Sequence, residues 1–225
     1  MGTAWTEQGS GIHEVEPRAP ESVREALRRA LSTVRPGAVK VGMAVGPATA
    51  AAIVEALEGY AGPVVVDPVL ATSRGGPLWS ARPGELLPLL RRATLVTPNA
   101  PEAAALAARA VASAADAEIA GRQLVGTAGL AAVLVKGGHL PALAGEVVDL
   151  LVTPTDTVRF THRHVAGASP RGTGCALATA IAVELAREAE LAAAIGHASA
   201  WLAKAIAAAT TLGSGERRLP TAVRR

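Results

Sequence analysis

The sequence has very little cysteine and no long apolar run. Its only cysteine, Cys175, cannot form an internal disulfide, so nothing in the chain requires an oxidising compartment. The first residues lack the basic and apolar regions of a secretory signal peptide. No run of about 18 apolar residues is present, and the nearest approach, 123–135, ends at Lys136. We therefore expect a cytoplasmic protein with no membrane partner.

The sequence also has few aromatic residues and a small net charge. Aromatic side chains make up 2% of the 225 residues, although 50% are hydrophobic, so alanine, valine and leucine must fill the core. Such small side chains suit helices packed closely on a sheet, and the length suits one domain. The net charge of +3 resides in the tail at 214–225, which contains one glutamate and Arg217, Arg218, Arg224 and Arg225. The rest of the chain is neutral, so nucleic acid is not an expected partner.

Short β-branched runs alternate with longer helical stretches. Uniformly apolar runs at 38–43, 63–67, 94–97 and 132–136 predict strands buried on both faces. Helical spacing is found at 20–31, 47–57, 101–111, 116–125, 174–187 and 191–209. This alternation predicts βαβ units, a mostly parallel sheet and right-handed crossovers. We also expect a strand at 3–8 and an antiparallel hairpin, formed by 147–153 and 157–160, at a sheet edge.

Each predicted parallel strand ends near polar or charged residues. In parallel α/β sheets, ligands bind beyond the carboxyl ends of the strands. Only three of the 22 basic residues are lysines, and two of these, Lys40 and Lys136, lie in strand-end motifs. Lys136 is expected to reach a nucleotide phosphate, whereas Lys40 fits equally well in a structural ion pair. Asp67 is placed to hold a metal or to orient a hydroxyl group.

A glycine-bearing turn opens an apolar helix at Gly172, Thr173 and Gly174. Glycine lets the backbone approach a ligand closely, and the free N–H groups and partial positive charge of a helix start attract anions. An ordinary tight turn is the alternative. Cys175 follows in the first turn, where we expect the helix end to lower the thiol pKa so that the thiol can accept a proton. A small buried hydrophobic residue is the alternative for Cys175.

Asn99 and Glu102 are three residues apart, just after a predicted strand. Oxygen ligands with this spacing suit Mg²⁺, which keeps several waters and takes few protein ligands. The same spacing is that of a helix capping box, with Asn99 as the N-cap. The two roles are compatible.

These motifs, in this order, resemble the hydroxymethylpyrimidine (phosphate) kinases of thiamine biosynthesis, within the ribokinase-like superfamily. The matching sequences are Val-Lys-Val-Gly-Met, Val-Val-Asp-Pro-Val-Leu, Thr-Pro-Asn-Ala-Pro-Glu, Lys-Gly-Gly-His and Gly-Thr-Gly-Cys, between residues 38 and 177. Cysteine after Gly-Thr-Gly is similar to the pyrimidine kinase branch, whereas other branches generally have aspartate there. The resemblance implies a three-layer α/β sandwich with a mostly parallel sheet in a kinase domain at 1–213, followed by the basic tail at 214–225.

The resemblance also implies a reaction and a set of site residues. The reaction is transfer of the γ-phosphoryl group of ATP, with Mg²⁺, to a hydroxymethyl oxygen or to the phosphate already on it. Gly172, Thr173 and Gly174 would form the anion hole, with Cys175 as the catalytic base. ATP would contact Lys136, Gly137, Asn99 and Thr97. Magnesium and its waters would be held by Glu102, Asn99 and Asp67. The pyrimidine would contact Gln8, Met43, Asp67 and Val69.

The sequence departs from the family pattern at two places. The usual first strand and helix are missing before the strand expected at 3–8, and Arg171 stands where the family has histidine. An open sheet edge would follow, and proteins tend to pair such edges, so we expect a homodimer or a larger assembly. The missing unit also leaves open a non-catalytic ligand-binding protein. Pyridoxal and related vitamin alcohols remain alternative acceptors.

Overall fold

The computed structural model describes residues 1–8, 12–72, 76–140, 145–164, 170–213 and 217–220, without the side chains of 5–8, 12 and 13. The side chain of Gln8 and most of the tail at 214–225 therefore lie outside the described residues. None of the helices within these ranges has the length and apolar character needed to span a bilayer.

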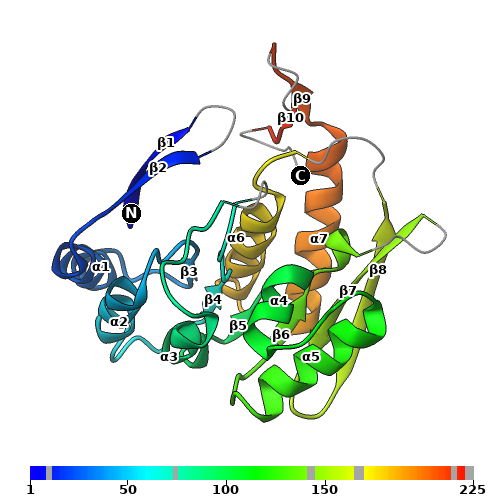
Figure 1. The fold of residues 1–225 in the computed structure, drawn as a ribbon, viewed down its shortest axis with the longest axis horizontal. Coiled ribbons are helices and arrows are strands. Elements are labelled where there is room, and N and C mark those ends of the chain that lie inside the picture. The colour runs from blue at the N-terminus through cyan, green and yellow to red at the C-terminus, as the bar shows by residue number, and fades with distance from the viewer. Residues whose placement is uncertain (9–11, 73–75, 141–144, 165–169, 214–216, 221–225) are drawn as a thin grey trace.

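A six-stranded mixed sheet forms the centre of the molecule (Figure 1). Its strands, in spatial order, are β3 (Val39–Val41), β4 (Val64–Val66), β5 (Leu95–Val96), β6 (Val133–Val135), β7 (Glu146–Val152) and β8 (Thr157–Arg163). The first four strands are parallel, and β7 pairs antiparallel with both β6 and β8. The predicted parallel strands and the hairpin at the sheet edge are confirmed.

Two helical layers bury this sheet. One face is covered by α1 (Pro20–Val34), α2 (Pro47–Ala56), α3 (Leu87–Arg91), α4 (Ala100–Ala107) and α5 (Ala114–Gly126), and the other by α6 (Thr173–Leu185) and α7 (Leu191–Ala207). The consecutive valines of β4 show the division, because Val64 and Val66 pack in the first layer and Val65 in the second. Strands covered on both faces are uniformly apolar, and this is the pattern in the sequence. The three-layer α/β sandwich is confirmed.

The predicted helices are present, with some different ends. The helix expected at 101–111 ends at Ala107, because Ala108 takes a left-handed conformation (φ 50°) and its N–H bonds to the carbonyl of Ala104. The short α3, the 3₁₀ turn η1 (Pro83–Leu86) and the 3₁₀ turn η2 (Gly137–His139) were not predicted. They are too short to show a helical period.

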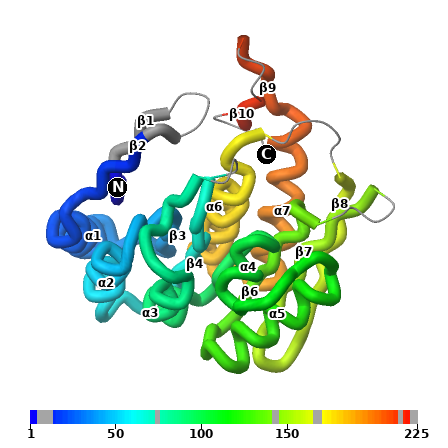
Figure 2. The backbone as a smooth tube through the Cα atoms, viewed as in Figure 1, coloured from blue at the N-terminus to red at the C-terminus, as the bar shows by residue number. Residues whose placement is uncertain are grey.

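Two small ribbons lie outside the main sheet (Figure 2). One joins β1 (Ala4–Gln8) to β2 (Ile12–Pro17), and the other joins β9 (Thr210–Thr211) to β10 (Arg217–Arg218). β1 was expected, whereas β2 and β9 were not. β10 places two residues of the basic tail against the domain, since the N–H of Arg171 also donates to the carbonyl of Arg217 at 3.3 Å.

Candidate active site

The carboxyl ends of β4, β5 and β6 bring Asp67, Thr97 and Lys136 together. Lys136 Nζ donates to Asp67 Oδ1 at 2.8 Å, and Thr97 Oγ1 donates to the same oxygen at 3.3 Å. Asp67 and Thr97 are buried, and the side chain of Lys136 is 12% exposed. A buried charge is costly unless it is paired and hydrogen-bonded, so the Asp67 carboxylate needs both the Lys136 ammonium and the Thr97 hydroxyl. The three neighbouring strands thus assemble one charged cluster, as the sequence predicts.

The N-terminus of α6 meets this cluster. Gly172 caps the helix in a left-handed conformation (φ 79°), and helical residues begin at Thr173. A Cβ built on Gly174 would lie 3.1 Å from Lys136 Nζ and 3.9 Å from Asp67 Oδ2. Glycine therefore allows the first turn of α6 to approach the ammonium closely. The helix start and Lys136 together form a place for an anion.

Cys175 lies in the first turn of α6, and its pKa is shifted upward. Cys175 as a whole residue is exposed, yet loss of water around the thiol is the largest cause of the rise. Lys40 and Lys136 oppose the shift, while Asp67 adds to it. The expected lowering of this pKa is therefore wrong, because desolvation and Asp67 together outweigh the two lysines. The raised pKa favours the protonated thiol at neutral pH.

Asn99 and Glu102 form a reciprocal capping box at the start of α4. The N–H of Asn99 donates to Glu102 Oε2 at 2.8 Å, and the N–H of Glu102 donates to Asn99 Oδ1 at 2.9 Å. The capping role is confirmed. Burial raises the pKa of Glu102 to about 7, against the opposing effects of Lys136 and the Asn99 N–H, and the Asp67 carboxylate raises it further.

The donor set at this edge fits a magnesium ion that retains its waters. The Asp67 carboxylate lies close enough to raise the pKa of Glu102, and a divalent cation would relieve this repulsion. Within the described residues, no group of three or more His, Cys, Asp or Glu side chains is placed to hold a metal. Mg²⁺ commonly takes only one or two carboxylates, with substrate phosphates and waters as its other ligands.

Asp149 is a site residue that the sequence reasoning missed. It lies in β7, is 4% exposed, and its Oδ1 accepts the N–H of Gly137 at 2.7 Å. A Cβ on Gly137 would overlap the carbonyl oxygen of Val148, so only glycine fits there. Burial raises the pKa of Asp149, while His162 and the Gly137 N–H oppose the rise. The carboxylate thus anchors the turn that directly follows Lys136. A lone acid inside an apolar strand run was the available signal.

The residues expected to contact the pyrimidine are partly placed. Met43 lies just beyond the end of β3, where its carbonyl oxygen accepts a hydrogen bond from Thr3 Oγ1 at 2.7 Å. Val69 follows Asp67 and is half-buried, with its N–H donating to the Asp67 carbonyl at 2.8 Å. Both lie at the same edge of the sheet as the charged cluster. Gln8 is in β1, but its side chain is outside the described residues.

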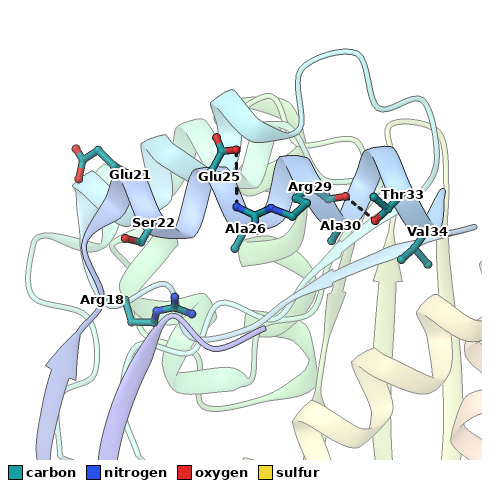
Figure 3. Close-up of a pocket in the computed structure, with 9 residues that line it drawn as sticks. All are labelled: Arg18, Glu21, Ser22, Glu25, Ala26, Arg29, Ala30, Thr33 and Val34. Carbon is teal, nitrogen blue, oxygen red and sulfur yellow. Dashed lines mark hydrogen bonds and ion pairs between the residues drawn. The ribbon is translucent and has the colours of Figure 1, made fainter.

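A separate groove runs along α1 and is unrelated to this cluster (Figure 3). All its lining residues lie between Arg18 and Val34, with both acids and arginines among them. Arg29 faces Glu25 at 4.0 Å, and both side chains are exposed, so this ion pair is solvated. No strand-end residue lines the groove, and we do not assign the active site to it.

A mostly parallel sheet between two helical layers, with a lysine at a strand end and a glycine-capped helix start beside it, defines a ribokinase-like fold. A family model for phosphomethylpyrimidine kinase matches residues 2–220. Hydroxymethylpyrimidine/phosphomethylpyrimidine kinases from Rhizobium meliloti and Bacillus subtilis are 38% and 31% identical to the chain. These alignments each cover 97% of this chain, and 82% and 81% of the relatives. The chain belongs to the phosphomethylpyrimidine kinase family.

Solved structures share the fold over most of the chain. The crystal structure of phosphomethylpyrimidine kinase from Clostridium difficile has a TM-score of 0.74 at 28% identity, covering 91% of this chain and 84% of that one. Pyridoxal kinase from Staphylococcus aureus, in complex with AMP-PCP and pyridoxal, has a TM-score of 0.82 at 25% identity. That comparison covers 96% of this chain and 78% of the kinase.

Proposed function

We propose that this protein transfers the γ-phosphoryl group of ATP to hydroxymethylpyrimidine or to its monophosphate, as an enzyme of thiamine biosynthesis. One observation carries the proposal: the Lys136–Asp67 ion pair meets the first turn of α6 at Gly174, beside Cys175. The names of the relatives support the acceptor, and the AMP-PCP complex of the S. aureus kinase supports a nucleotide donor.

The chain's own residues would position the reactants and stabilise charge, which is the main task in phosphoryl transfer. The N–H groups of Gly172, Thr173 and Gly174 would hold the transferred phosphoryl group. ATP would lie toward Lys136, Gly137, Thr97 and Asn99. Bound Mg²⁺ would neutralise phosphate charge, and Glu102 and Asp67 would hold it through its waters.

Proton transfer concerns only the alcohol acceptor. Its oxygen attacks the γ-phosphorus, the bond from that phosphorus to the bridging oxygen breaks, and ADP leaves with the electron pair. The hydroxyl proton must pass to a base, for which Cys175 is the candidate. Since desolvation raises the pKa of the thiol, this role requires that bound reactants lower it.

The first experiment measures ADP release from ATP and Mg²⁺ with each acceptor, for the full chain and for Cys175→Ala. Val183→Ala is the control, because Val183 is on the same helix but is 43% exposed. We expect turnover in the parent chain and in the control, and a loss of about 100-fold or more in Cys175→Ala, as for removal of a general base. No turnover by the parent chain would contradict the proposal and favour a non-catalytic ligand-binding protein.

Pyridoxal is the second candidate acceptor. The observation that favours it is the TM-score of 0.82 to the S. aureus pyridoxal kinase, above the 0.74 for the C. difficile enzyme. The same ADP assay with pyridoxal decides between them. A kcat/KM for pyridoxal above that for hydroxymethylpyrimidine would overturn our assignment.

We also propose that the protein acts in the cytoplasm as a homodimer. The support for a dimer is β3, which pairs with β4 and with no other described strand, so that its outer edge is free to pair or to be covered.

A further inference from the structure

Lys40 lies on the face of the sheet that α6 covers. It is the central residue of β3 and is paired in register with Val65 of β4. Paired residues on neighbouring strands point to the same face, and Val65 packs with Leu177 and Ile181 of α6. The next residue, Val41, packs in the opposite layer. The side chain of Lys40 therefore starts on the side of the sheet that also holds the anion-binding helix.

The Lys40 ammonium reaches the active-site end of that face. A Cβ built on Gly42 would lie 2.6 Å from Lys40 Nζ, so the side chain runs along the strand toward its carboxyl end. The absence of a side chain at Gly42 gives the ammonium this path. The charge also acts on Cys175, whose pKa it lowers. Lys40 and Lys136 thus bring two positive charges to the first turn of α6.

The two lysines differ in their partners. Lys136 is paired with Asp67 at 2.8 Å. The side chain of Lys40 is half-buried and forms no ion pair or hydrogen bond with any residue in the described part of the chain. The sequence left a structural ion pair open for Lys40, and the structure contains none in these ranges. A partly desolvated ammonium without a partner is a place for an anionic ligand.

The position of Lys40 in the sheet indicates which anion it meets. The strand β3 is at one edge of the sheet, next to β4. The strand β6, which leads to Lys136 and Gly137, is separated from β3 by β4 and β5. Met43 and Val69, the residues expected at the acceptor, follow β3 and β4. Lys40 is therefore on the acceptor side of the cluster, whereas Lys136 is on the proposed nucleotide side.

We propose that Lys40 binds the phosphate of a phosphorylated acceptor and thereby determines whether a phosphate monoester is used. This inference rests on the proposed function. With such an acceptor, a phosphate oxygen attacks the γ-phosphorus and a P–O–P bond forms. The bond from the γ-phosphorus to the bridging oxygen of ATP breaks, and ADP takes the electron pair. A dianionic acceptor phosphate has no proton to lose, so this transfer needs a cation to hold the acceptor and no base.

The test compares Lys40→Met with the full chain, using hydroxymethylpyrimidine and its monophosphate as separate acceptors. We expect kcat/KM for the monophosphate to fall by about 10- to 100-fold, as for loss of a hydrogen bond to a charged group. The loss for the alcohol should be several-fold smaller, because that acceptor loses only the effect of the Lys40 charge on Cys175. Lys40→Arg should recover part of the loss. Lys204→Met is the control, because Lys204 is exposed on α7 and should affect neither acceptor. If Lys40→Met does not fold, Lys40→Gln replaces it.

Two kinetic outcomes would overturn the inference. An equal loss for both acceptors would assign Lys40 to the nucleotide or to Cys175, and no loss for either would leave it without a role. If the full chain turns over neither acceptor, the proposed function fails, and calorimetry then decides on Lys40. Binding of the monophosphate to the full chain, weakened in Lys40→Met, would still support its phosphate contact. Equal binding to both proteins, or none to the full chain, would refute it.

Discussion

Replacing Glu102 by glutamine should stabilise the protein at alkaline pH. Burial raises the pKa of Glu102 from 4.5 to about 7, which means that the folded state binds this proton more tightly than the unfolded state. The contribution of Glu102 to the free energy of unfolding therefore falls as the pH rises from about 4.5 to about 7, and the loss is complete above that range. A shift of this size corresponds to about 3 kcal/mol. Glutamine keeps an oxygen for the Asn99 N–H but carries no charge, so it avoids the loss.

Urea denaturation at pH 5 and at pH 8 provides the assay. We expect the free energy of unfolding of Glu102→Gln to exceed that of the parent chain by about 3 kcal/mol at pH 8, and by under about 1 kcal/mol at pH 5. Asp149 also has a raised pKa, but it is present in both proteins and cancels in the difference. Glu58→Gln is the matched control, since Glu58 is exposed and its replacement should change stability by less than about 0.5 kcal/mol.

Magnesium separates the two roles of Glu102. If the carboxylate holds Mg²⁺ through its waters, the ion should stabilise the parent chain at pH 8 more than it stabilises Glu102→Gln, which keeps only Asp67 as a charged ligand. Equal stability of the two proteins at pH 8, without the ion, would refute the reasoning from burial.

Three further predictions concern the turn after Lys136 and the assembly. Asp149→Ala leaves the buried N–H of Gly137 unsatisfied, so KM for ATP should rise more than kcat falls, with a stability loss of about 1–3 kcal/mol. Asp149→Asn should restore most of the stability and most of the ATP affinity, because asparagine keeps an oxygen for the Gly137 N–H. If it does not, the negative charge of Asp149 is needed and the hydrogen bond alone is not enough. Gly137→Ala should lower the melting temperature by several degrees more than Gly138→Ala, where an added Cβ meets nothing within 4 Å. Light scattering at micromolar concentration should give the mass of a dimer, and a monomer mass would contradict our proposal.

The sheet could be predicted because its strands are buried on both faces. Uninterrupted apolar runs such as Val64–Val66 and Val133–Val135 are typical of strands that are buried on both faces of a sheet. The two-stranded ribbons outside the main sheet were harder to predict from the sequence. β9 and β10 have two residues each, and their pairing depends on where α7 ends in space. No local pattern reports such a contact.

The sequence predicted which residues meet at the candidate site better than it predicted their pKa shifts. Strand-end chemistry and the glycine turn place Asp67, Lys136 and Cys175 in one cluster, and the structure brings them together. The direction of the Cys175 pKa shift could not be predicted, because it depends on how much water reaches the thiol. Asp149 was missed because its partner is a backbone N–H in the turn after β6, which no side-chain motif reveals.

The ion pair between Lys136 and Asp67 joins residues 69 positions apart in the chain. Contacts of such long range form late in folding, after local hairpins and helix pairs, because closing a long loop costs entropy before the contact is gained. We therefore expect the anion site to be absent from partly folded forms of the chain. A phosphate ligand that binds only the finished sheet would stabilise the domain as a whole rather than one loop, by mass action. Nucleotide supplied during refolding should for this reason raise the yield of native protein without speeding the first steps of collapse.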